Sequence, residues 1–190
     1  MYACTLTYSK SLVNELYGDG GLSGTHWDNW IKVYMKQNPE AKENFGYLSF
    51  HHDIPLASVA HDHDEIVNKL KTKHTVFRPF SANGHAYLVI ITADKFYVYI
   101  NGSMPVPRRA ARLYEALQKT EKKRTFVEIR SPVQRGGNDC VAFMALMATT
   151  WMAGTEFTEE VAAREIPKFR ATLKKYMLEA KPSGYMWRYY

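Results

Sequence analysis

Residues 75–101 read TVFRPFSANGHAYLVIITADKFYVYIN and contain three runs rich in β-branched and aromatic residues, with short polar turns between them. The runs cover residues 75–80, 86–92 and 96–100, and each has the length and composition of a β-strand. Residues 93–95 join the last two runs, a length suited to a hairpin. We therefore expect a short antiparallel sheet in the middle of the chain.

Helical patterns, with apolar side chains every three or four residues, lie on both sides of this sheet. Residues 140–154 are apolar nearly all round and end at Gly154. The last helix is expected to begin near Thr158 and to break at Pro167, because proline lacks the amide hydrogen that a helix needs. The order predicts an α+β fold, a small and mostly antiparallel sheet flanked by helices. The other expected elements are helices at 22–37, 64–71 and after Pro107, and short strands at 45–50 and 125–130.

The composition predicts one domain covering residues 1–190. With 46% hydrophobic and 23% charged residues, the chain falls outside the disordered, collagen-like and coiled-coil classes. Its two cysteines, Cys4 and Cys140, cannot build a disulfide framework, and its start has no signal-peptide pattern. No apolar run approaches the ~20 residues that cross a bilayer. We expect a protein of an intracellular, reducing compartment with no membrane partner.

The positive charge is concentrated in one segment. The chain has 25 basic and 19 acidic residues, and nine basic against three acidic residues lie between Arg108 and Arg135. Such a segment either forms a solvated helix face beside a lysine-rich turn or contacts phosphates. The candidates for a nucleic-acid patch are Arg108, Arg109, Arg112, Lys119, Lys122, Lys123 and Arg124.

Cys140 is the strongest candidate for a chemical role. It stands where a polar Gly-Gly loop meets the start of the apolar helix. A helix N-terminus presents unpaired N–H groups and a partial positive charge, and both favour a thiolate over a thiol. The alternative is a cysteine that packs as a small hydrophobic side chain.

A thiolate nucleophile needs a base and a residue that orients the base. His85 comes directly before the most hydrophobic strand, and Asn101 ends the next one. Because a hairpin brings the start of one strand beside the end of its partner, the two should be neighbours. Asn101 before Gly102 is equally typical of a turn. Gln134, six residues before Cys140, could help to form an oxyanion hole with the backbone N–H of Cys140.

The order of these four residues resembles the cysteine proteases that include the adenovirus maturation protease and the SUMO-specific proteases. The match is carried by residues 75–143, and residues 22–35 resemble more weakly the helix near the start of the SUMO-protease catalytic domain. The matching strings are VFRPFSANGH, FYVYINGS and QRGGNDC.

The resemblance implies that Cys140 is the nucleophile, His85 the general base, Asn101 its orienting residue and Gln134 the oxyanion donor, with no cofactor or metal needed for the chemistry. Asn101 stands where the family usually has an acid, Ala86 where SUMO proteases have a tunnel tryptophan, and Val141 where the family has glycine.

The expected function is a thiol endopeptidase, foremost a virus-encoded protease that cleaves capsid or core precursors during virion maturation, located in the virion or the host cytoplasm. The small, basic chain favours this interpretation, and the resemblance implies that DNA or a peptide could act as an activator. One alternative is a deubiquitinase or SUMO isopeptidase, such as a bacterial effector. Another is a catalytically inactive nucleic-acid-binding module.

A metal site is a weaker alternative. His51-His52-Asp53 and residues 61–65, His-Asp-His-Asp-Glu, supply ligand types that zinc prefers. The second string departs from the metallo-β-lactamase pattern at Glu65 and Ile66. We expect a polar loop with a helix start there.

Overall fold

The computed structural model describes residues 14–16, 21–50, 57–82, 84–101, 104–120, 123–132, 134 and 138–179. Its centre is a five-stranded sheet in the order β1-β2-β3-β4-β5. The three central strands are antiparallel, whereas β1 pairs with β2 and β5 pairs with β4 in parallel. The strands are β1 Phe45–Tyr47, β2 Thr75–Ala82, β3 His85–Ile91, β4 Lys95–Asn101 and β5 Thr125–Ser131.

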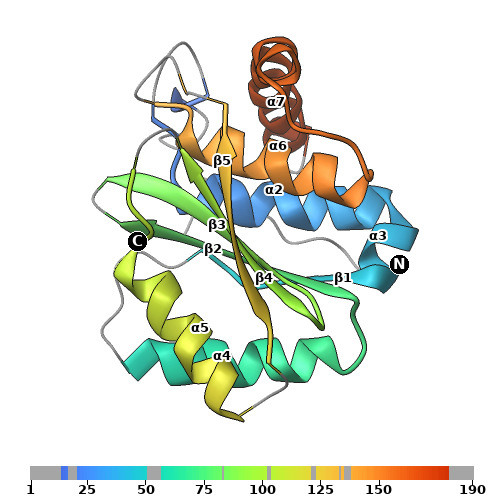
Figure 1. Ribbon diagram of the computed structural model, residues 1–190. Helices are drawn as coiled ribbons and strands as arrows, with labels where there is room; N and C mark the ends of the chain where they lie inside the picture. Colours follow the sequence, from blue (N-terminus) through green and yellow to red (C-terminus); the bar gives the residue numbers. More distant parts are fainter. Residues whose placement is uncertain are drawn as a thin grey trace.

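Helices cover both faces of this sheet (Figure 1). Helices α2, α6 and α7 lie on one side, and α4 and α5 lie on the other. This arrangement confirms the expected α+β class with helices flanking the sheet, but the sheet is mixed rather than mostly antiparallel, because two of its four described strand pairs are parallel. The helices are α2 Gly24–Gln37, α3 Pro39–Asn44, α4 Ala57–Leu70, α5 Arg108–Thr120, α6 Cys140–Met152 and α7 Glu159–Glu179.

The alternation of side chains along each strand produces two hydrophobic cores. On β3, Leu88 and Ile90 pack toward α2, α6 and α7, whereas Val89 and Ile91 pack toward α4 and α5. Helix α6 is buried on nearly all sides because it lies between the sheet and its two neighbouring helices. This environment explains its continuous apolar sequence.

Three expectations differ most from the structure. The strand predicted at 45–50 ends at Tyr47, and the helix predicted at 64–71 begins already at Ala57. The predicted break at Pro167 is wrong, because α7 continues through that residue. Proline removes one backbone hydrogen bond, and the burial of Phe169, Leu173 and Met177 holds the rest of the helix in place.

A charged cluster lies inside the core between the sheet and α4. Arg78 of β2, fully buried, donates from Nη2 to Oδ2 of Asp62 at 2.8 Å, and Arg109 of α5 donates to the same oxygen at 3.2 Å. Burial lowers the pKa of Arg78, and the Asp62 carboxylate opposes that shift. Asp62 therefore links α4, α5 and β2. Within the described ranges, no helix has the length and apolar character to cross a membrane.

Candidate functional site

The ends of three strands bring the predicted site residues to one end of the sheet. His85 is the first residue of β3 and Asn101 the last of β4, and these strands are antiparallel. Asn101 is paired with Ser131, the last residue of β5. The chain leaves this end of the sheet at Ser131, passes through Gln134 and enters α6 at Cys140. The backbone therefore returns to the end where His85 and Asn101 lie.

An aromatic contact places the end of α6 near the start of β4. Trp151, near the end of the helix, packs edge-on against Tyr97, near the start of β4, with ring centroids 4.7 Å apart. From Trp151 back to Cys140 the helix rises about 16 Å, and from Tyr97 forward to Asn101 the strand rises about 13 Å. In Figure 1, α6 runs back from Trp151 toward the end of the sheet where β4 and β5 end, so Cys140 lies toward the end that carries His85 and Asn101.

The surroundings of Cys140 suit a reactive thiol. Cys140 is a free, partly exposed cysteine at the first position of α6. It borders the same hydrophobic core as Ala86, the residue after His85. His85 is itself partly exposed at the rim of the sheet. Exposure and a helix N-terminus together are what a cysteine nucleophile requires.

An ion pair that the sequence analysis missed holds the residue before the cysteine. Arg170 of α7 donates to Oδ1 of Asp139 from Nη2 at 2.6 Å and from Nε at 3.0 Å. The same guanidinium donates to the backbone carbonyls of Asn138 and Glu15. Asp139 is the N-cap residue of α6, yet its carboxylate makes no cap hydrogen bond to the helix. Arg170 therefore pairs with the carboxylate of the residue directly before the cysteine.

Helix α2 is also attached to this loop. The backbone N–H of Leu22 donates to the carbonyl of Asn138 at 3.4 Å. Ser23 caps the helix together with His26, which is buried and accepts the Ser23 N–H at Nδ1. The segment before Cys140 is thus bound from both α2 and α7.

Two predicted side chains are not placed in detail. Asn101 is described as the end of β4, but its side chain lies outside the described residues. Gln134 is partly buried, and most of its neighbours in the loop lie outside the described residues as well. Their roles in orienting the base and binding the oxyanion remain predictions.

The structure divides the predicted basic patch. Arg124 does not belong to the surface, because it is buried and donates from Nε to the carbonyl of Thr92. The guanidinium of Arg109 forms an ion pair with Asp62. Lys122 lies outside the described residues. The exposed cations that remain are Arg108, Arg112, Lys119 and Lys123.

The histidine-rich segment of the metal alternative forms part of α4. His61 and His63 lie on this helix, which corrects the expected polar loop, and Asp62 between them is bound to two arginines. In the described part of the chain, no three His, Cys, Asp or Glu side chains are grouped so that they could hold a metal ion. His51, His52 and Asp53 lie outside the described residues.

Comparison with solved structures relates this fold to SUMO proteases. The chain superposes on the SUMO protease Ulp1 with its catalytic cysteine oxidised to a sulfonic acid, with a TM-score of 0.72 and 14% identity over 92% of this chain and 85% of the other. The C-terminal Ulp1 protease domain in complex with Smt3, the yeast ortholog of SUMO, gives a TM-score of 0.66 and 14% identity over 92% and 87%.

A third structure agrees. The catalytic domain of the Chaetomium thermophilum Ulp1-like SUMO protease gives a TM-score of 0.59 and 15% identity over 84% of this chain and 74% of the other. No protein-family model matches the sequence. No curated protein matches it either. The chain therefore shares the α+β fold of SUMO-protease catalytic domains at a level of identity that establishes the fold alone.

Proposed function

We propose that this protein is a cysteine peptidase with Cys140 as its nucleophile. The observation that carries the proposal is the position of Cys140, a free and partly exposed thiol at the start of α6, toward the end of the sheet where β3 begins with His85. The fold shared with SUMO proteases, one of them with a catalytic cysteine, supports it.

In the proposed reaction the Cys140 sulfur attacks the substrate carbonyl carbon and the C=O π electrons move to the oxygen. The resulting oxyanion is held by the Cys140 backbone N–H and the Gln134 amide. His85 holds the thiol proton and gives it to the leaving amine as the C–N bond breaks, and Asn101 orients the imidazole. Water, deprotonated by His85, then hydrolyses the thioester and regenerates the thiol.

The proposed substrate is a protein. The Ulp1 structure with Smt3 supports a ubiquitin-like tail, which makes the isopeptidase alternative as strong as the viral-precursor interpretation. Ala86 packs against the core beside the site, and a small side chain there leaves more room than a tryptophan would. That difference favours a less restricted endopeptidase.

Probe labelling separates these substrates. Electrophilic probes that carry a ubiquitin tail, a SUMO tail or a generic peptide are each incubated with the protein, and the modified cysteine is located by mass spectrometry. Labelling of Cys140 only by a tailed probe supports the isopeptidase, and labelling by the generic probe supports the endopeptidase. The Cys4→Ser variant is the control, because it removes the other cysteine. If no probe labels Cys140, the peptidase proposal fails.

A nucleic-acid role has one specific observation in its favour. Arg108, Arg112 and Lys119 are exposed and fall on one face of α5, at spacings of four and seven residues. Such a face can contact successive phosphates, as an activator site or as the function of a chain without catalysis. DNA binding that is lost in Arg108→Glu/Arg112→Glu supports this role. If Cys140→Ala leaves the cleavage of every candidate substrate at the level of the unmodified protein and of a blank without protein, while DNA binding depends on these arginines, the chain is the inactive module.

A further inference from the structure

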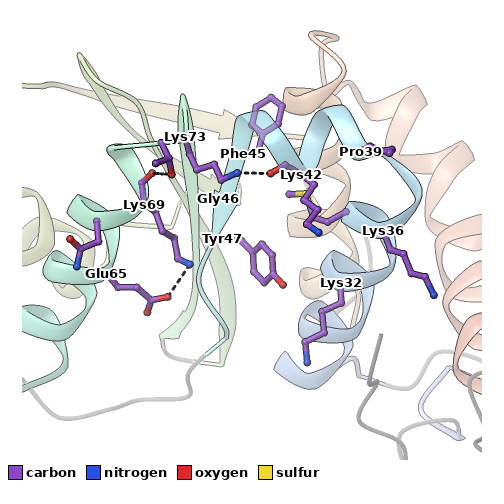
Figure 2. A pocket seen from close by; sticks show the side chains of 13 residues that line it. Lys32, Lys36, Pro39, Lys42, Phe45, Gly46, Tyr47, Glu65, Lys69 and Lys73 are labelled. Atoms are coloured by element: carbon purple, nitrogen blue, oxygen red, sulfur yellow. Dashed lines mark hydrogen bonds and ion pairs between the residues drawn. The ribbon is translucent and has the colours of Figure 1, made fainter. Parts of the chain in front are cut away.

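A cavity of about 830 Å³ opens at the edge of the sheet, away from the strand ends that carry His85 and Asn101. Its walls come from α2 and α3 on one side and from α4 on the other, and the edge strand β1 lies between them (Figure 2). We call it the β1-edge cavity. Its volume falls in the ~300–1,000 Å³ range of sites that bind small molecules.

The charges of this cavity are almost all positive. Five lysines and one acidic residue, Glu65, line it. Lys69 pairs with Glu65 at 3.3 Å, and Lys73 donates to the carbonyls of Lys42 and Glu43 at the end of α3. The side chains of Lys32 and Lys42 have no hydrogen bond or ion pair among the described residues. The cavity therefore has a surplus of positive charge that its own residues do not neutralise.

The floor of the cavity is apolar and aromatic. Phe45 and Tyr47 of β1 and Met35 of α2 contribute to its lining. Figure 2 shows the Tyr47 ring between Lys69 on the α4 side and Lys32 and Lys42 on the other side, whereas Lys36 points outward. A flat apolar body could rest on this floor while its charged groups meet the lysines.

Packing holds Lys69 of α4 and Lys73, which follows this helix, in place. A side-chain Cβ built on Gly46 would lie 3.3 Å from Cδ of Lys69 and 3.4 Å from Cγ of Lys73. The aliphatic parts of both lysines therefore lie directly on β1, and part of their conformational entropy is lost before any ligand arrives. A preordered cation costs less to engage than a freely moving one.

We infer that the β1-edge cavity binds a small organic phosphate that carries two or more phosphate groups and an aromatic body, the chemistry of a nucleoside di- or triphosphate. Lysine ammonium groups bind phosphate as point charges without requiring the paired geometry of a guanidinium. The aromatic body packs on Tyr47, and the phosphates are neutralised by Lys32, Lys42 and Lys69, the last of which exchanges Glu65 for phosphate. This inference concerns a different part of the fold from the proposed peptidase site and does not depend on it.

Calorimetric titration with ATP and with inorganic tripolyphosphate at ~0.15 M salt tests the inference, since loose surface attraction is largely screened there. Both should bind saturably with one site per chain, and ATP should bind more tightly because of its aromatic body. Lys32→Ala/Lys42→Ala should weaken both by roughly tenfold or more. The matched control Lys95→Ala/Lys168→Ala removes the same charge from exposed positions at the start of β4 and on α7, and should change neither.

Two further variants test the details. Glu65→Gln removes the carboxylate that competes with phosphate for Lys69, and should tighten binding by roughly threefold or more. Tyr47→Leu should weaken ATP and leave tripolyphosphate unchanged. Circular dichroism confirms that each variant is folded. The inference is overturned by absence of saturable binding, by equal losses in the two lysine pairs, by unchanged or weaker binding in Glu65→Gln, or by tripolyphosphate binding as tightly as ATP.

Discussion

Arg170 binds Asp139 through two donors, at 2.6 Å and 3.0 Å, and Asp139 is the residue directly before Cys140. The pair joins α7 to the start of α6 across 31 residues of sequence. Arg170 is mostly buried, so a charge-assisted hydrogen bond of this kind is stronger than one on an open surface. In our account Arg170 is a positioning residue that keeps the charge of Asp139 away from the thiolate.

Arg170→Gln should therefore slow the alkylation of Cys140 by iodoacetamide at neutral pH by roughly tenfold, because the unneutralised Asp139 opposes the thiolate. The double variant Arg170→Gln/Asp139→Asn removes both charges and should recover much of the rate. Arg170→Lys keeps the charge and should fall between wild type and Arg170→Gln. If the double variant reacts as slowly as Arg170→Gln, the effect is purely structural and this role of Arg170 is wrong.

Asp62 should be essential for stability. Asp62→Ala leaves the buried Arg78 charge without its carboxylate, and breaking a buried ion pair costs about 3–5 kcal/mol. Urea unfolding followed by tryptophan fluorescence measures this loss. Asp64→Ala, at an exposed position on the same helix, is the control and should change the free energy of unfolding by less than about 1 kcal/mol. Similar losses in the two variants would contradict the importance of the cluster.

Gly24 should not tolerate alanine, although alanine ordinarily stabilises a helix by about 1 kcal/mol relative to glycine. A Cβ at Gly24 would lie 2.1 Å from Cδ1 of Phe50 and 2.5 Å from its Cγ. Gly24→Ala should therefore destabilise the protein by about 1–3 kcal/mol. Phe50→Leu offers more room, so the cost of Gly24→Ala should be smaller in that background. Thermal unfolding of the four proteins in this cycle provides the measurement, and a stabilising Gly24→Ala would exclude the close packing.

Tyr99 should make the stability depend on alkaline pH. Burial raises the pKa of its phenol from 10.0 to about 12. Between these values the unfolded chain loses the proton while the folded chain keeps it, so the free energy of unfolding falls as pH rises through this range and levels off above it. Below pH 10 the phenol contributes no pH dependence.

The Tyr99→Phe variant isolates this contribution from that of the other tyrosines. The difference in unfolding free energy between wild type and variant should be constant below pH 10 and should then change by roughly 2 kcal/mol up to pH 12, to the disadvantage of wild type. Denaturant titrations from pH 8 to pH 11 would already reveal the slope. Parallel curves for the two proteins would show that Tyr99 ionises equally in both states.

The elements predicted best from the sequence are those whose pattern is local. The β3–β4 hairpin follows from two hydrophobic runs with a three-residue connection, and its antiparallel register places His85 and Asn101 at one end of the sheet. The start of α6 follows from the change between a Gly-Gly loop and an apolar run. Cys140 could be chosen as a nucleophile because these two local patterns meet there.

The remaining features depend on contacts between distant segments. Each edge strand is parallel to its neighbour because a helix connects the two, α4 between β1 and β2 and α5 between β4 and β5. No local sequence pattern reveals this pairing. The role of Arg170 is similar, since its partner lies 31 residues away. One signal was present, because Arg170 falls on the same helical stripe as Leu173 and Met177. A charged residue on an apolar stripe predicts a buried partner without identifying it.

Two expectations drawn from local sequence were wrong because the residues lie within longer helices that tertiary contacts stabilise. Pro167 ordinarily ends a helix, but α7 loses only one hydrogen bond there and is held by its buried face. The polar segment around Asp62 was expected to be a polar loop with a helix start. It lies within α4, where the buried Asp62 carboxylate accepts hydrogen bonds from Arg78 and Arg109.

The central claim is that His85 activates Cys140. Its most direct test is the alkylation rate of Cys140 at neutral pH. This rate is compared between the Cys4→Ser protein and the Cys4→Ser protein that also carries His85→Ala. Our account predicts that the variant reacts more slowly by roughly tenfold or more, because the thiolate loses the base that holds its proton. Equal rates in the two proteins, both shown to be folded, would contradict the account.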